Sequence, residues 1–96
     1  MRKVRFQANL PVTFMREGDQ FVAYTPALDL STAGSTFEQA KKRFAEAVHI
    51  FVEECLKMDT LAAVLEGLGW VRHRSEWVPP IVVAQESQTF NLPVIA

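Results

Sequence analysis

A long amphipathic helix, predicted over residues 37–58, constrains the fold of this chain more than any other sequence feature. Thr36 precedes it as the N-cap, and Gln39, three residues on, is of the type that completes a capping box. A helix of this span would be about 33 Å long at 1.5 Å per residue, enough to cross the face of a small sheet. Its apolar residues recur at steps of three and four: Phe37, Ala40, Phe44, Ala47, Val48, Phe51, Val52, Cys55 and Leu56.

The apolar surface of this helix is wider than one sheet face needs. One stripe comprises Phe37, Ala40, Phe44, Ala47, Phe51 and Cys55, and a second stripe beside it comprises Ala45, Val48, Val52 and Leu56. A short helix over residues 61–68 would cover part of the second stripe, and a partner chain would cover the rest. The pattern leaves both readings open, packing within the chain and an interface with another molecule.

Three strands are predicted before the helix. Residues 4–15 alternate between apolar and polar side chains and predict one long bent strand that changes phase at Pro11. A turn at residues 17–19 leads into a second strand over residues 21–24, and a third, short strand ends at Gly34. These segments predict a three-stranded antiparallel sheet.

After the long helix, Thr60 provides a second cap signal, and Gly67 and Gly69 end a helix of about two turns. Residues 70–78 lack clean periodicity and are predicted to form a loop with some strand character. The apolar runs 81–84 and 89–94 look extended, so at least one strand is expected there to close the sheet. The predicted fold is therefore one α+β domain spanning residues 1–96.

Composition excludes several classes of function. A formal net charge of −1 over 96 residues gives no general attraction to nucleic acid or to anionic membranes. The single cysteine, Cys55, lies on the apolar helix face and suits a buried thiol in a reducing compartment. No apolar run has the length of a signal or a membrane span, so a cytoplasmic protein without membrane contact is expected.

Residues that carry chemistry are few and scattered. His49 and His73 have no Cys, His, Asp or Glu at metal-ligand spacing, and the aspartates fall at turn, strand and cap positions. We therefore predict no catalytic residue, no metal site and no cofactor. The cations of residues 72–74 between Trp70 and Trp77 have the composition of a small RNA-contacting patch, although tryptophans in such a segment more often anchor it on the core.

Binding to other proteins is thus the function that the residues favour, with a homodimer or a higher homo-oligomer expected. The second stripe and the aromatic C-terminal part supply the candidate interface residues: Val48, Val52, Leu56, Trp70, Trp77, Phe90 and Leu92. An extended C-terminal strand is a second candidate contact surface, because it can add to the sheet edge of a neighbour. The entry to the helix is interpreted as structural, through Pro26, Gly34, Thr36 and Gln39.

Residues 21–40 (FVAYTPALDLSTAGSTFEQA) resemble the conserved segment of the HicB antitoxin family, in which a strand ending in a Pro turn leads through a Gly to Thr-x-Glu-Glu-Ala at the head of a helix. Gln39 stands here in place of the second glutamate. Residues 68–81 and 91–96 also look like a compact HicB-like subgroup. The resemblance implies the HicB N-terminal domain fold, a partial ribonuclease-H-like fold.

What the resemblance implies about function is an antitoxin that binds a HicA-type toxin, an mRNA interferase, and masks its active site. Many family members carry a further DNA-binding domain, which has no counterpart here, so DNA binding by this chain alone is not expected. Two alternatives remain open. One is a solitary oligomeric domain that binds a ligand or a protein without a toxin, and the other is a ribonuclease-H-like nuclease, for which the sequence supplies no acidic cluster.

Overall fold

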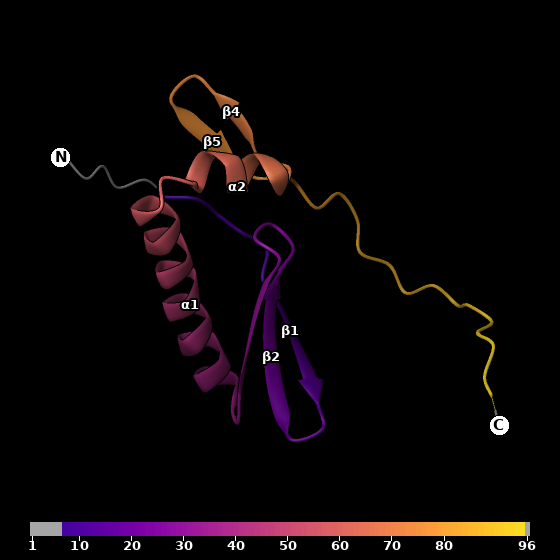
Figure 1. Ribbon diagram of the computed structural model, residues 1–96. Coiled ribbons are helices and arrows are strands. Elements are labelled where there is room, and N and C mark those ends of the chain that lie inside the picture. Colours follow the sequence, from indigo (N-terminus) through magenta and orange to yellow (C-terminus); the bar gives the residue numbers. More distant parts are fainter. Residues whose placement is uncertain (1–6, 96) are drawn as a thin grey trace.

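The structure, a computed structural model, describes residues 7–95 and has an α+β fold. The strands β1 (Thr13–Glu17), β2 (Gln20–Thr25) and β3 (Leu30–Gly34) form an antiparallel sheet in the order β1-β2-β3. The helix α1 (Phe37–Lys57) crosses one face of this sheet, and the shorter helix α2 (Leu61–Gly67) lies at one end (Figure 1). The predicted three-stranded sheet, long helix and short helix are confirmed.

The tight turn between β1 and β2 consists of Gly18 and Asp19, since Glu17 pairs with Gln20. Gly18 has a φ of +57°, a conformation that glycine adopts without steric cost and that two-residue hairpin turns require. The hairpin that the sequence predicts therefore forms at the predicted turn.

The start of α1 confirms Thr36 as the N-cap. Its hydroxyl oxygen accepts a hydrogen bond from the backbone N–H of Gln39 at 3.0 Å. The Gln39 side chain reaches back one residue further than a capping box predicts, because its Oε1 accepts bonds from the N–H and the hydroxyl of Ser35, at 2.7 and 2.9 Å. Together these bonds fix the angle between β3 and α1.

Close packing of α1 on the sheet depends on small residues. Ala23 and Thr25 of β2 have no exposed surface, and Gly34 of β3 lies so near α1 that an added Cβ would be 2.6 Å from the backbone nitrogen of Ala40. Two rings contact each other across this interface, those of Phe14 on β1 and Phe37 on α1, with centroids 4.7 Å apart. The small side chains therefore determine how near α1 comes to the sheet.

A hydrophobic cluster joins the sheet to α2. It consists of Ala27, Leu28, Leu65 and Trp70, all buried. The indole N–H of Trp70 donates to the carbonyl of Ala27 at 2.7 Å, so its one polar atom is paired inside the cluster. Trp70 thus holds the segment after α2 against the turn between β2 and β3.

Residues 70–78, predicted as a loop with some strand character, form a small hairpin. The strands β4 (Val71–His73) and β5 (Glu76–Val78) pair only with each other among the described residues, and Arg74 in the turn has a φ of +60°. The guanidinium of Arg72 lies 5.8 Å from the ring centre of Trp77, its cross-strand partner. The turn contains no glycine, and the strands are too short to show an alternating pattern, so this hairpin is hard to recognise from the sequence.

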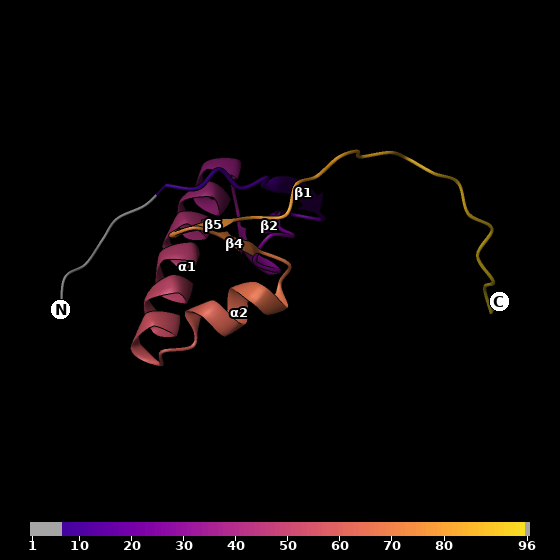
Figure 2. The ribbon, with the colours of Figure 1, turned by 90° about the horizontal axis from the view of Figure 1, so that it is seen from above.

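Two further strand predictions need correction. The first strand begins at Thr13, after Pro11, and residues 7–12 have no regular structure, while residues 4–6 of that prediction lie outside the described residues. The closing strand expected within residues 81–84 or 89–94 is wrong, because residues 79–95 form neither helix nor strand. Residues 79–95 run out past the sheet on the side away from α1 (Figures 1 and 2).

Candidate protein-binding groove

The second stripe of α1 borders an open apolar groove. α2 covers only part of the stripe, and the segment before β1 lies along the other side, which leaves a cavity of about 450 Å³ between them. Aliphatic side chains and one indole provide most of its wall. The lining residues are Gln7, Ala8, Leu10, Leu28, Ala45, Val48, His49, Val52, Leu61, Leu65 and Trp70.

The turn between the two helices opens this groove. Asp59 adopts a φ of +56°, and the N–H of Thr60 donates to the carbonyl of Cys55 at 2.9 Å, which ends α1 and redirects the chain. The short α2 then presents Leu61 and Leu65, one helical turn apart, to the groove. With only seven residues, α2 is too short to cover the whole second stripe.

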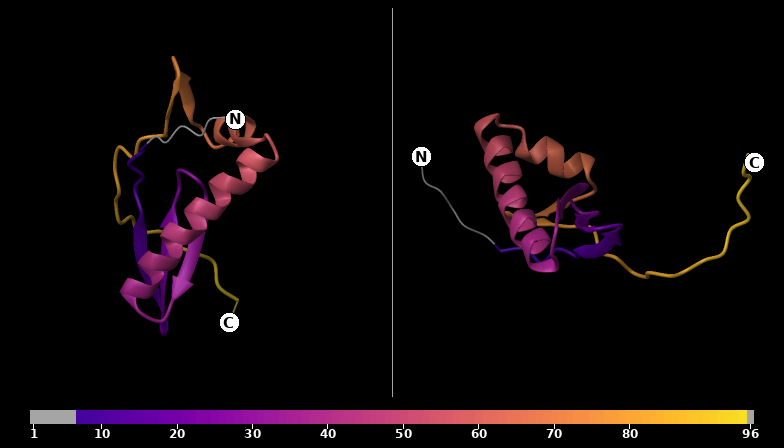
Figure 3. Two further views of the ribbon diagram at one scale, coloured as in Figure 1. Left: turned by 90° about the vertical axis from the view of Figure 1, so that its left-hand side faces the viewer. Right: turned by 90° about the horizontal axis from the view of Figure 1, so that it is seen from below.

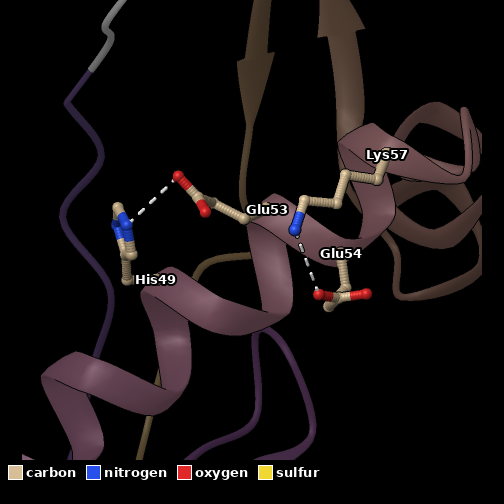
Figure 4. Close-up of polar contacts among 4 residues, drawn as sticks. All are labelled: His49, Glu53, Glu54 and Lys57. Atoms are coloured by element: carbon tan, nitrogen blue, oxygen red, sulfur yellow. Dashed lines mark ion pairs between the residues drawn. The ribbon is translucent and has the colours of Figure 1, made fainter.

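Two pairs of ionisable side chains lie along α1, and of their four residues only His49 lines the groove. The Nε2 of His49 lies 3.2 Å from the Oε1 of Glu53, and the Nζ of Lys57 lies 3.6 Å from the Oε1 of Glu54 (Figure 4). All four side chains are substantially solvent-exposed, so each pair contributes at most about 1 kcal/mol to stability. The groove itself thus offers mainly apolar contact.

The structure brings some of the predicted interface residues together and separates others. Val48 and Val52 are half-buried and line the groove, whereas Trp70 lines it as a core residue that is 6% exposed. Leu56 is 56% exposed on α1 but does not line the groove. The remaining three are Trp77, which is half-buried against the core cluster, and Phe90 and Leu92, which are exposed in residues 79–95.

The sequence alone does not predict the wall of the groove formed by the segment before β1. Leu61 and Leu65 are recognisable as the stripe of a short helix, but Leu10 falls within the long strand that the alternation predicts. Its place beside α1 depends on where the chain runs before β1, which no local pattern encodes.

Groups that could do acid–base or metal chemistry lie apart. Asp19 is in the turn between β1 and β2, Asp59 is in the turn between α1 and α2, and Asp29 accepts a hydrogen bond from the hydroxyl of Tyr24 at 3.1 Å. That bond, with partial desolvation and the nearby charge of Asp29, raises the pKa of Tyr24 above its ordinary value of 10.0. Within residues 7–95, no three or more His, Cys, Asp or Glu side chains gather where they could hold a metal ion.

The motif residues of the helix entry have structural roles. The carbonyl of Pro26 accepts from the N–H of Asp29 at 3.4 Å in the turn between β2 and β3, and Gly34 allows the close approach of α1. The hydroxyls of Ser35 and Thr36 are occupied by their bonds with Gln39. Cys55 is 8% exposed and is a core residue, as predicted.

No family model, no curated protein and no solved structure matches this chain in the comparisons with known proteins. Among the helices in the described part of the chain, none combines the length and the apolar character needed to cross a membrane. The groove and the exposed apolar residues are therefore the observations on which a functional proposal must rest.

Proposed function

We propose that this chain is a non-enzymatic binding protein of the HicB-like antitoxin type, which neutralises a HicA-type mRNA interferase by direct contact. The observation that carries the proposal is the apolar groove beside α1, where Val48, Val52 and Leu61 remain accessible. Aliphatic side chains that are only half-buried in the free chain are typical of the apolar core of a protein interface. The residues that carry the resemblance, around Gly34 and Thr36, lead directly into this helix.

The proposal is supported by how little of the apolar surface the chain covers by itself. Apolar residues make up 49% of the sequence, yet many large ones are well exposed among the described residues. On α1 and just after it these include Leu56 at 56% and Met58 at 67%. A partner that buries such side chains would contribute about 25 cal/mol for each Å² of apolar surface removed from water.

The first test is genetic. A gene for a small basic protein should lie beside the gene for this chain, and its product should arrest bacterial growth unless this chain is co-expressed. The two proteins should co-purify, and this chain should suppress cleavage of mRNA by the partner. A neighbourhood without such a gene, together with no binding to any HicA-type protein, would contradict the proposal.

The role of the groove is tested with two separate variants, each of which introduces one aspartate into α1. Val52→Asp puts a carboxylate in the groove wall, whereas Ile50→Asp puts it on an exposed position of the same helix that does not line the groove. We expect Val52→Asp to weaken toxin binding by about a hundredfold and Ile50→Asp to change it little, because an unpaired charge cannot be buried without a large cost. Equal effects of the two variants would place the interface elsewhere.

A second candidate function is a solitary domain that holds an apolar ligand in the same groove. The cavity of about 450 Å³ and its mostly aliphatic wall favour it, since ligand pockets commonly have volumes of about 300–1,000 Å³. Because Trp70 lines the groove, titration with a medium-chain fatty acid should change tryptophan fluorescence if the groove takes such ligands. Trp77→Phe leaves Trp70 as the sole reporter and serves as the background for this titration.

A further inference from the structure

Most apolar side chains of residues 79–95 are largely exposed, although Pro79 is half-buried and Val82 is only 41% exposed. Only Glu86 carries a charge in this segment, and its exposed apolar residues include Ile81 at 79%, Val83 at 94%, Phe90 at 70% and Leu92 at 75%. The run 81–84 (IVVA) is rich in β-branched residues, which suit a strand. Residues 81–84 are therefore a strand-forming sequence without a strand partner in the described part of the chain.

The same chain offers an open strand edge. In the register of the β1–β2 hairpin, Thr13, Met15 and Glu17 direct their backbone groups toward β2, which leaves those of Phe14 and Arg16 on the outer side. Among residues 7–95, nothing forms a hydrogen bond with the backbone N–H or C=O of Phe14 or Arg16. The outer edge of β1 can therefore accept another strand.

The opposite edge of the sheet is obstructed. The register of β2 with β3 directs the backbone groups of Ser31 and Ala33 outward, and the Nη1 of Arg43 on α1 donates to the carbonyl of Ala33 at 3.0 Å. The side chain of Arg43 thus occupies the position that an added strand would need. Of the two edges, β1 is the one available for pairing.

We propose that two copies of this chain exchange these segments, so that residues 81–84 of each copy add as a strand to the outer edge of β1 in the other. Residues 79–95 leave the body on the β1 side of the sheet, which places the donor segment and the acceptor edge of one copy near each other (Figures 2 and 3). A twofold axis beside β1 then brings each donor to the edge of the other copy. A second copy is a suitable partner because it carries both a donor segment and an open β1 edge. In such a dimer the β1 edges of both copies would be paired.

This dimer goes beyond the proposed toxin binding and stands without it, because it concerns the purified chain alone and a different surface from the groove. Backbone hydrogen bonds along β1 would provide the affinity, and the alternating side chains Ile81 and Val83 would pack on one face of the enlarged sheet.

The test uses proline, which cannot donate a backbone hydrogen bond. On the donor side, the double variant Val82→Pro with Val83→Pro removes two successive N–H groups, which point to opposite sides of a strand, so one of them would face β1 in either register. The double variant Ser87→Pro with Gln88→Pro is the matched control in the same exposed segment. On the acceptor side, Arg16→Pro removes an N–H that points away from β2, and Arg16→Ala is the control that keeps it. Circular dichroism of all four variants checks that each is folded before its mass is measured.

Sedimentation velocity should give a dimer for the wild type and for both controls. The donor and acceptor variants should each have a dimer Kd about a hundredfold higher, since each lost hydrogen bond weakens the pairing several-fold. Mixed together, the donor variant and the acceptor variant should form a heterodimer more readily than either forms a homodimer, because one intact segment can still meet one intact edge.

Three results would overturn the proposal. The first is a wild-type mass that remains monomeric at every concentration. The second is a dimer that neither proline variant weakens, which would place the interface on another surface. The third is a monomer whose Phe14 and Arg16 amides are protected from hydrogen exchange, which would mean that the segment pairs with its own β1.

Discussion

Gly34 sets the distance between the sheet and the long helix. A methyl group at this position would lie 2.6 Å from the backbone nitrogen of Ala40, and neither backbone can retreat without shifting α1. We expect Gly34→Ala to lower the free energy of unfolding by about 1–3 kcal/mol, the usual cost of overpacking. Gly67→Ala is the control, because nothing lies within 4 Å of its added Cβ, and at this position in α2 it should leave the midpoint of urea denaturation unchanged or raise it slightly. Equal stability of the two variants would contradict the close approach.

Tyr24 gives the fold a dependence on alkaline pH. Its raised pKa, due first to the hydrogen bond with Asp29, means that the folded chain favours the neutral phenol. The stabilising effect is complete below the unfolded pKa of 10.0 and is lost as the pH rises through the folded value. Since Tyr24 is the only tyrosine, ultraviolet absorbance can follow its ionisation directly.

Asp29→Gly should shift the titration of Tyr24 to lower pH and flatten the loss of stability at alkaline pH. Glycine removes the acceptor while keeping the φ of +48° that position 29 adopts. Asp19→Asn, in a different turn, should not move the titration. A Tyr24 pKa that is the same in all three proteins would show that the bond to Asp29 has no influence on it.

At the scale of elements, α1 divides into a core face and exposed positions. Phe44 is 6% exposed, whereas Ile50 on the same helix is 59% exposed. Phe44→Ala should lower the free energy of unfolding by about 3–5 kcal/mol through the cavity it leaves. Ile50→Ala should change it by about 0.5 kcal/mol or less. Thermal unfolding measures both, and a Phe44→Ala variant that melts like the wild type would remove Phe44 from the core.

Elements encoded by neighbouring residues are predictable from the sequence, and elements that depend on a distant partner are not. The bounds of α1 follow from the cap at Thr36 and the apolar spacing, both of which act within one or two turns. The run 81–84 has strand propensity, but propensity does not tell whether an unpaired edge lies within reach. For the same reason Val48 and Val52 are recognisable as surplus apolar positions, whereas the wall formed by Leu10 is not.

At the scale of the whole molecule, Trp70 connects the two parts of the fold. Its indole N–H bonds to the carbonyl of Ala27, which is 43 residues earlier in the chain. Trp70→Phe keeps most of the ring but leaves that buried carbonyl without this donor, so we expect a loss of about 1–3 kcal/mol in chemical denaturation. Trp77→Phe, at a half-buried position, should cost less. If Trp77→Phe is the more damaging change, the hairpin and not Trp70 anchors this end of the molecule.

The bond from Arg43 to Ala33 also bears on how far association of this chain can proceed. A sheet with two open edges can be extended by successive copies without limit, and an apolar, uncharged run such as residues 81–84 would then seed fibres. With the β3 edge obstructed by Arg43, each copy offers one accepting edge, and the proposed reciprocal pairing would occupy it. If the proposed dimer forms, Arg43 would limit association to two copies, and Arg43→Ala should produce a protein whose turbidity rises on concentration while the wild type stays clear.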